Sequence, residues 1–153
     1  MPAGRHAHIP IGGPAVGQAT AALDAFCAAE QLPEEIAWRL RVALDEIIAN
    51  VVTYGTLGAR PAELAAGGRS EPPAVDVWFH RDGLLVEVTI EDDGPPFDPL
   101  ARPDPVVTLP LENRQPGGLG IALVKVLMDD VRYERTTRNV LIIRKHLEAG
   151  PAA

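Results

Sequence analysis

The chain has 153 residues, of which 46% are hydrophobic and 23% are charged. This composition is typical of one folded domain with its own core, and it excludes a disordered chain. The formal net charge of −7 excludes a broad nucleic-acid surface, which would need a basic patch to neutralise phosphates. A small anionic ligand is still allowed, because backbone N–H groups bind phosphate without net positive charge.

The cysteine count and the apolar runs bear on the cellular compartment. Cys27 is the one cysteine, so no internal disulfide can form, which suits a reducing cytoplasm. Its alanine-rich surroundings favour a small buried residue over a reactive thiol. The N-terminal "MPAGRHAHIP" lacks the apolar core of a signal peptide, and no apolar run approaches membrane-spanning length. We therefore expect a cytoplasmic protein without membrane contact.

Two helices are predicted in the first third of the chain. Ala15–Glu30 is rich in alanine, and "LPEE" (Leu32–Glu35) begins a second helix with a proline and two acids in its first turn. Apolar residues at helical spacing predict one buried stripe as far as about Thr53, formed by Ile36, Leu40, Ala43, Ile47 and Val51. Gly55 and Gly58 are expected to end this helix.

A loop, a hairpin and a second loop are predicted next. Arg60–Pro73 has the composition of a surface loop. Apolar and polar residues then alternate, which predicts that Val75–His80 pairs with Leu84–Asp92 around a turn at Arg81–Gly83. Pro95–Pro116 is rich in proline and lacks a sustained period, so we expect a long loop that acts as a lid.

The last third predicts a helix and two strands. "GGLG" (Gly117–Gly120) precedes a helix, and "VRYER" and "NVLIIRKH" follow as strands. The helix should bury one face, made of Ile121, Val124, Leu127 and Met128. The whole order predicts an α+β fold with a largely antiparallel sheet and helices on one face. We expect one domain over residues 1–153, with a core at 15–147, a flexible N-terminus at 1–8 and a tail at 148–153.

Polar residues interrupt the second helix at "LDEIIANVV". Glu46 and Asn50 are four residues apart, so they project from one helix face about a turn apart. Asn is a poor interior helix former, which makes Asn50 harder to explain as ordinary surface. A carboxylate and an amide oxygen there could hold a divalent cation or activate a nucleophile. A plain solvated face is the alternative.

Two further motifs are candidates for a ligand site. In "EDDGPPFDP", Asp92 at a strand end could accept a hydrogen bond from an exocyclic amine, and Gly94 would allow close approach to a flat ring. An ordinary turn is the alternative. Gly117–Gly120 could bind phosphate at a helix start, or could be a flexible joint. No P-loop motif occurs in the chain.

Taken in order, these motifs resemble the GHKL ATPase family, the fold of histidine kinases, gyrase B, Hsp90 and MutL. "LDEIIANVVTYG", "IEDDGPPFDP" and "GGLGIALVKVLMDDVRYER" are most similar to the small anti-sigma factor serine/threonine kinases. The resemblance covers Ile36–Leu147. It implies a two-layer α/β sandwich of the Bergerat type that binds ATP and Mg²⁺.

The resemblance also implies a role for each matching residue. Asn50 matches the asparagine that holds magnesium against the nucleotide phosphates, and Glu46 matches the general base of members that activate a hydroxyl or water. Asp92 matches the aspartate that accepts the adenine amine, and Gly94 matches the glycine beneath the ring. Asp45 competes for the role of base, although it points in another direction on the helix and reads as structural or solvated.

The remaining correspondences concern the phosphates and the lid. Gly118 and Gly120 match the glycines whose loop, with Leu119 between them, cradles phosphate, and Pro95–Pro116 matches the ATP lid. Three residues depart from the family pattern. Pro96 stands where many members have a second glycine, and Tyr54 stands where close relatives often have a histidine. Asn139 falls near a strand position that is often a threonine beside the adenine pocket. None of these departures removes a proposed catalytic group.

The implied activity is phosphorylation of a serine or threonine on an anti-anti-sigma (STAS) partner, together with sequestration of a sigma factor. A homodimer is a further expectation from the resemblance. The alternative is a binding module of the same fold without useful turnover, which the glutamate at Glu46 disfavours. A histidine kinase catalytic domain is disfavoured, because the chain has no room for a separate helical dimerisation domain.

Overall fold

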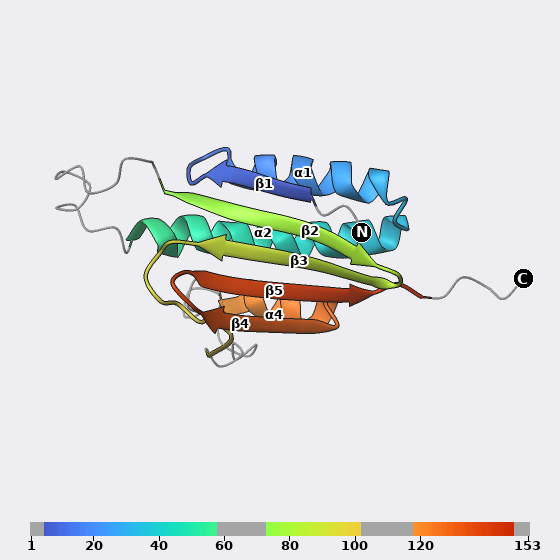
Figure 1. Ribbon diagram of the computed structural model, residues 1–153. Helices are drawn as coiled ribbons and strands as arrows, with labels where there is room; N and C mark the ends of the chain where they lie inside the picture. The colour runs from blue at the N-terminus through green and yellow to red at the C-terminus, as the bar shows by residue number, and fades with distance from the viewer. Residues whose placement is uncertain (1–4, 58–72, 102–117, 149–153) are drawn as a thin grey trace, which may run out of the picture.

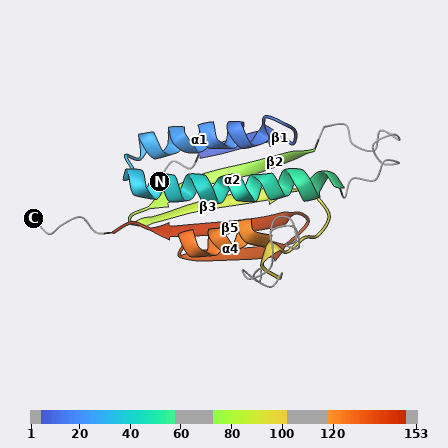
Figure 2. The same ribbon diagram turned by 180° about the vertical axis from the view of Figure 1, so that it is seen from behind.

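The computed structural model describes residues 5–57, 73–101 and 118–148, which form a five-stranded sheet with helices on one face. Figures 1 and 2 show the two layers from the sheet side and from the helix side. With the labels of Figure 1, the elements are β1 (Arg5–Pro10), α1 (Ala15–Ala29), α2 (Glu34–Leu57), β2 (Ala74–Asp82), β3 (Leu85–Asp92), the short 3₁₀ helix η1 (Pro99–Ala101), α4 (Gly118–Leu127), β4 (Asp130–Arg135) and β5 (Asn139–His146).

The sheet has the strand order β1-β2-β3-β5-β4, and every neighbouring pair is antiparallel. Strand β5 therefore lies between β3 and β4, so it brings its first residue, Asn139, directly opposite Asp92. The helices α1, α2 and α4 lie side by side across the sheet (Figure 2). This confirms the predicted α+β fold with helices on one face.

The core lies between these layers. Its sheet side includes Val75, Val77 and Phe79, which alternate along β2 with Asp76 and Trp78 of the other face. Phe79 stacks on Phe26 of α1 with ring centroids 5.5 Å apart, which ties the first helix to the sheet. Cys27 is also buried, and burial raises the pKa of its thiol to about 11.

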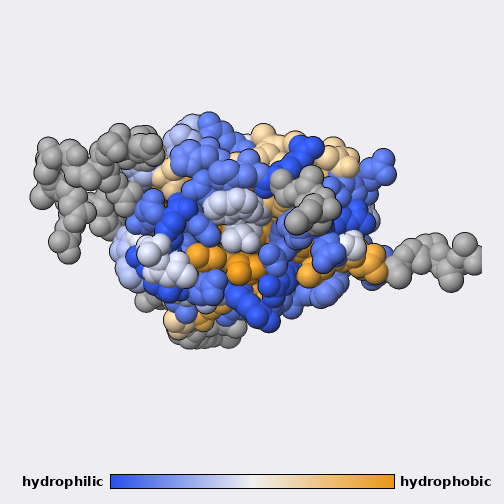
Figure 3. Space-filling view, in the orientation of Figure 1, coloured by the Kyte–Doolittle hydropathy of each residue, from blue (hydrophilic) through white to orange (hydrophobic). Residues whose placement is uncertain are grey.

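The other face of the sheet carries no helix and is mostly hydrophilic (Figure 3). A small apolar area interrupts it, to which Val140 and Ile142 of β5 belong by the alternation of the strand. Trp78 of β2 lies on the same face, where the His6 ring stacks on it with centroids 4.7 Å apart. The polar side chains of this open face form the ion pairs discussed below.

The N-terminal strand differs from our expectation. Residues 5–8 belong to the segment that we expected to be flexible, yet Arg5–Pro10 pairs with β2 along its whole length. Only Ile9 of this strand is buried. With so few apolar residues, the strand cannot be recognised from its own sequence, because its order depends on pairing with a distant segment.

Two boundaries also differ. The helix α2 runs through Gly55 to Leu57, since one glycine inside a helix costs only about 1 kcal/mol relative to alanine. The hairpin turn has two residues instead of three, since Arg81 and Asp82 belong to β2 and the pairing of Asp82 with Leu85 leaves Gly83 and Leu84 as the turn. Gly83 takes a φ of 58°, a conformation that glycine adopts without strain.

Some predicted segments lie outside the described residues. These are residues 60–72 of the first loop, 102–116 of the lid, and Gly58 and Gly117. In the described part of the chain, no helix is long and apolar enough to cross a membrane.

Candidate functional site

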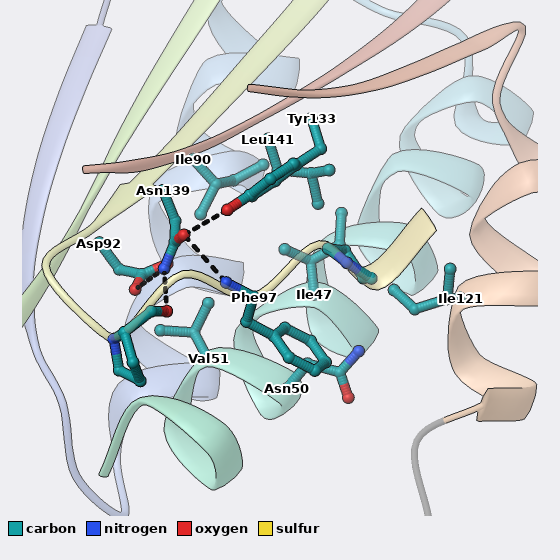
Figure 4. A pocket seen from close by; sticks show the side chains of 12 residues that line it. Ile47, Asn50, Val51, Ile90, Asp92, Phe97, Ile121, Tyr133, Asn139 and Leu141 are labelled. Carbon is teal, nitrogen blue, oxygen red and sulfur yellow. Dashed lines mark hydrogen bonds between the residues drawn. The ribbon is translucent and has the colours of Figure 1, made fainter. Parts of the chain in front are cut away.

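A pocket opens between the ends of β3 and β5, the middle of α2 and the first turns of α4 (Figure 4). The empty space in this hollow is about 500 Å³ when the open solvent at its mouth is included. Most of its walls are apolar, and four polar side chains interrupt them, namely Asn50, Asp92, Tyr133 and Asn139. The lining residues are Ile47, Asn50, Val51, Ile90, Asp92, Pro95, Phe97, Pro99, Ile121, Tyr133, Asn139 and Leu141. Such a pocket suits a flat, mostly apolar group held by a few polar contacts.

Asp92 is the carboxylate of this pocket, and it is 8% exposed. Its Oδ1 accepts hydrogen bonds from the backbone N–H of Gly94 at 2.9 Å and from Asn139 Nδ2 at 3.1 Å. Its Oδ2 has no hydrogen bond within the described residues, where no fully buried side-chain polar atom is left without a partner. Oδ2 therefore remains open to a donor from outside.

Gly94 forms the turn that leaves β3. Its N–H donates a hydrogen bond to the side chain of Asp92, two residues earlier, which forms an Asx turn. Its carbonyl accepts a hydrogen bond from Arg135 at 3.0 Å. Gly94 itself is not among the lining residues, although Pro95 is. Gly94 thus helps to position Asp92 without lining the pocket itself.

Asn139 was noted in the sequence only as a departure from a family pattern. The structure places it beside Asp92, with Tyr133 and Phe97 donating to its carbonyl oxygen at 2.6 and 3.3 Å (Figure 4). Sequence reasoning missed this arrangement because it depends on the register between β3 and β5. The one available signal was an asparagine at the start of a strand, where apolar residues are usual.

The polar residues of α2 point in different directions. Asn50 is half-buried and lines the pocket. Glu46 does not line it, but its carboxylate packs against Gly120 in the first turn of α4, where an added Cβ would lie 3.1 Å from Glu46 Cδ and closer still to Oε2. Asp45 binds elsewhere, since it accepts a hydrogen bond from Thr20 of α1 at 2.7 Å.

The glycine motif lies inside a helix rather than before it. We expected the helix to follow Gly120, but α4 begins at Gly118, so Gly118, Leu119 and Gly120 form its first turn. The N–H groups of a first turn have no partner within the helix and point outward along its axis. The turn keeps the donors expected of a phosphate site.

The donor set bears on magnesium as well. No cluster of three or more histidine, cysteine, aspartate or glutamate side chains could hold a metal ion within residues 5–57, 73–101 and 118–148. Magnesium in nucleotide sites usually takes one or two protein ligands and completes its shell with phosphate oxygens and water. The amide oxygen of Asn50 at the pocket wall fits that mode of binding.

These features define a class of protein. Residues 14–145 match the family model of the histidine kinase-like ATPase domain. The chain therefore belongs to the histidine kinase-like ATPase family.

Two relatives refine the comparison. The chain is 28% identical over 123 residues to the serine/threonine-protein kinase BtrW of Bordetella bronchiseptica, covering 76% of this chain and 79% of that protein. It also resembles the crystal structure of the RsbU and RsbW domains of a Mycobacterium tuberculosis protein, with a TM-score of 0.60 and 14% identity. That match covers 95% of this chain and 32% of the other, and at this identity it shows the shared fold.

Proposed function

We propose that this protein is an ATP-dependent serine/threonine kinase of the anti-sigma type. The observation that carries the proposal is the apolar pocket with the open oxygen of Asp92 at one end, in a chain of the histidine kinase-like ATPase family. An ionised carboxylate only accepts hydrogen bonds, so it selects a ring that offers an amine, as adenine does. The similarity to the kinase BtrW supports phosphotransfer over simple binding.

The rest of the site supports transfer of a phosphoryl group. Asn50 would hold Mg²⁺, which neutralises charge on the phosphates, and the first turn of α4 from Gly118 through Leu119 to Gly120 would bind them by its N–H groups. Glu46 lies against that turn and would accept the proton of an attacking hydroxyl. Gly94 would act on the adenine ring indirectly, because its N–H holds the carboxylate of Asp92.

The protein partners follow from the family resemblance. The proposed phosphoacceptor is a serine or threonine of a STAS-domain anti-anti-sigma protein, and the proposed second partner is a sigma factor that the kinase sequesters. We place this activity in the cytoplasm, with a homodimer as the proposed assembly.

Nucleotide binding is the first test. We expect ATP and ADP to bind the parent protein, and we expect Mg²⁺ to raise the affinity for ATP. Asp92→Asn should weaken ADP by about 10- to 100-fold, because a hydrogen bond to a charged acceptor is lost. Asn50→Ala should abolish the effect of Mg²⁺. Calorimetry measures each affinity, and Asp93→Asn, an exposed neighbour outside the pocket, is the matched control. A folded parent that binds no nucleotide would refute the proposal.

Phosphate transfer is the second part of the same test. With a STAS-domain protein as acceptor, Glu46→Gln should lower the transfer rate by about 10²- to 10⁴-fold at unchanged ATP affinity, as loss of a general base does. Asp45→Asn is the control, since that neighbouring carboxylate contacts Thr20. If the parent binds nucleotide but transfers no phosphoryl group, the kinase proposal fails and the protein is a binding module without turnover.

A further inference from the structure

The amide of Asn139 joins three segments of the chain at the wall of the pocket. The side chain is buried, with the residue 6% exposed. Its Nδ2 lies 3.1 Å from Asp92 Oδ1, 2.9 Å from the Pro95 carbonyl and 3.4 Å from the Gly94 carbonyl. On the other side, Oδ1 accepts from Tyr133, from Arg135 at 3.1 Å and from the N–H of Phe97.

The partners fix the orientation of this amide. A backbone N–H and a guanidinium can only donate, so the oxygen of Asn139 must face Phe97 and Arg135. Carbonyl and carboxylate oxygens only accept, so the NH₂ group must face Asp92 and Pro95. Both ends of the amide are then saturated, because an NH₂ group has two hydrogens and a carbonyl oxygen has two lone pairs. Asn139 has no capacity left for direct contact with a ligand.

The saturation of Asn139 gives it a role that acts through Asp92. With Oδ1 of Asp92 held by Asn139 and by the N–H of Gly94, the carboxylate cannot rotate freely, and Oδ2 is the oxygen left without a hydrogen bond in the described part of the chain. The same amide ties the Pro95 carbonyl and the Phe97 N–H to the start of β5, and both residues line the pocket. One side chain thus sets both the acceptor and part of the apolar wall.

We propose that Asn139 is a positioning residue that sets the preference for an amine-bearing base by orienting Asp92, without touching the base itself. This inference rests on the proposed nucleotide site. It predicts that a change at Asn139 lowers the affinity for a base with an exocyclic amine and spares a base without one. A residue with a purely structural role would lower both affinities together.

The test compares ADP with purine riboside 5′-diphosphate, which has the same ring system without the amine. Asn139→Thr and Asn139→Val have the same shape, both suit a strand, and differ in one hydroxyl that can donate to Asp92. In the parent, ADP should bind about tenfold or more tightly than the amine-free ligand. Asn139→Val should reduce this ratio to below about threefold, while Asn139→Thr should keep most of it.

The outcomes separate the alternatives. If Asn139→Val lowers the affinities for both ligands by the same factor, or leaves the ratio of the two affinities as in the parent, the positioning role is refuted. If the folded parent binds neither ligand, the proposed function itself fails. Thr89→Val, on the open face of β3, controls for a β-branched apolar change within the sheet. Calorimetry gives both affinities without any need for turnover.

A second variant covers the case in which Asn139→Val does not fold. Tyr133→Phe keeps the ring at the pocket wall and removes only the hydroxyl that donates to Asn139 at 2.6 Å. The amide then loses one of its restraints, and the ratio of the two affinities should fall by about two- to fivefold, as for loss of one hydrogen bond. An unchanged ratio in a folded Tyr133→Phe variant would count against the proposal.

Discussion

Arg138 and Asn139 are consecutive residues that hold the end of β3 from opposite faces of the sheet. On the open face, Arg138 pairs with Glu91 at 3.1 Å and with Asp93 at 2.8 Å. On the helix face, Asn139 holds the intervening Asp92. Three consecutive acids would repel one another strongly, but here Arg138 pairs with the outer two and Asn139 binds the middle one. The carboxylate in the pocket therefore stays in place beside two others.

The same guanidinium reaches a further carboxylate. Arg138 lies 2.9 Å from Asp76 Oδ2, while His6 and His8 of β1 lie 2.8 and 2.7 Å from Asp76 Oδ1. Burial acts to raise the pKa of Asp76, but the hydrogen bonds from His8, His6 and Arg138 outweigh it and lower the pKa below its ordinary value of 3.8. The cluster links the edge strand to the turn that carries Asn139.

A pH dependence of stability follows from Asp76. Because the pKa is lower in the folded state, the carboxylate stabilises the fold above the unfolded pKa of about 3.9 and loses this contribution as the pH falls through the folded value. Asp76→Asn should therefore cost about 1 to 2 kcal/mol of unfolding free energy near neutral pH, with the difference from the parent closing in acid.

Urea unfolding at neutral and at acid pH measures both quantities. The control is Asp82→Asn, an exposed acid without a hydrogen bond or ion pair in the described part of the chain, which should change stability by less than about 0.5 kcal/mol. A difference between parent and Asp76→Asn that persists at the lowest pH would contradict the assignment.

Among the elements, α2 and α4 meet where a side chain fills the space that a glycine leaves. The Glu46 carboxylate occupies the position that a Cβ of Gly120 would take. The obstructing atoms are the far end of a flexible side chain, so a larger residue at this position would displace Glu46 before it moved the helices. The contact therefore fixes Glu46 more than it stabilises the fold.

Two glycine-to-alanine substitutions test this point, Gly120→Ala and its control Gly17→Ala. Gly120→Ala should change the unfolding free energy by less than about 1 kcal/mol, since the helix propensity of alanine offsets the shift of Glu46. Phosphoryl transfer should fall by about tenfold or more, because Glu46 is the proposed general base and a misplaced base is costly. ATP affinity, measured separately, should stay within about threefold of the parent, since the backbone N–H groups remain.

Gly17→Ala is the matched control within α1. No atom lies within 4 Å of a Cβ built at Gly17, so this change should stabilise the protein by about 0.5 to 1 kcal/mol and leave transfer unchanged. If Gly120→Ala retains full transfer, the position of Glu46 against α4 is not required for activity.

For the whole molecule, local patterns predicted the elements and nonlocal pairing decided the details. The period of α2 and the alternation along β2 and β3 are strong because each element buries one face against the other layer. The strand at Arg5–Pro10 was missed because its order comes from β2, far along the chain. The contacts of Asn139 and Tyr133 were missed for the same reason, since an arrangement built across β3, β4 and β5 exists only once their register is known.

Cys27 makes the stability of the whole molecule measurable. It is the one thiol of the chain, it is 7% exposed in α1, and burial raises its pKa to about 11. Thiol reagents attack the thiolate, so we expect labelling at mildly alkaline pH to require opening of the core around it. A Cys27→Ala variant should give no signal, which supplies the background.

Labelling of this thiol then reports on ligands of the pocket, although Cys27 is not one of the residues that line it. When reclosing is faster than the chemical step, the labelling rate follows the population of the open form. A nucleotide that binds only the folded state lowers that population, by about 100-fold at 100 times its dissociation constant. A rate that does not change under saturating nucleotide would mean that α1 opens locally while the pocket stays formed. The single buried thiol thus gives a binding assay that needs no label on the nucleotide and no change in the pocket.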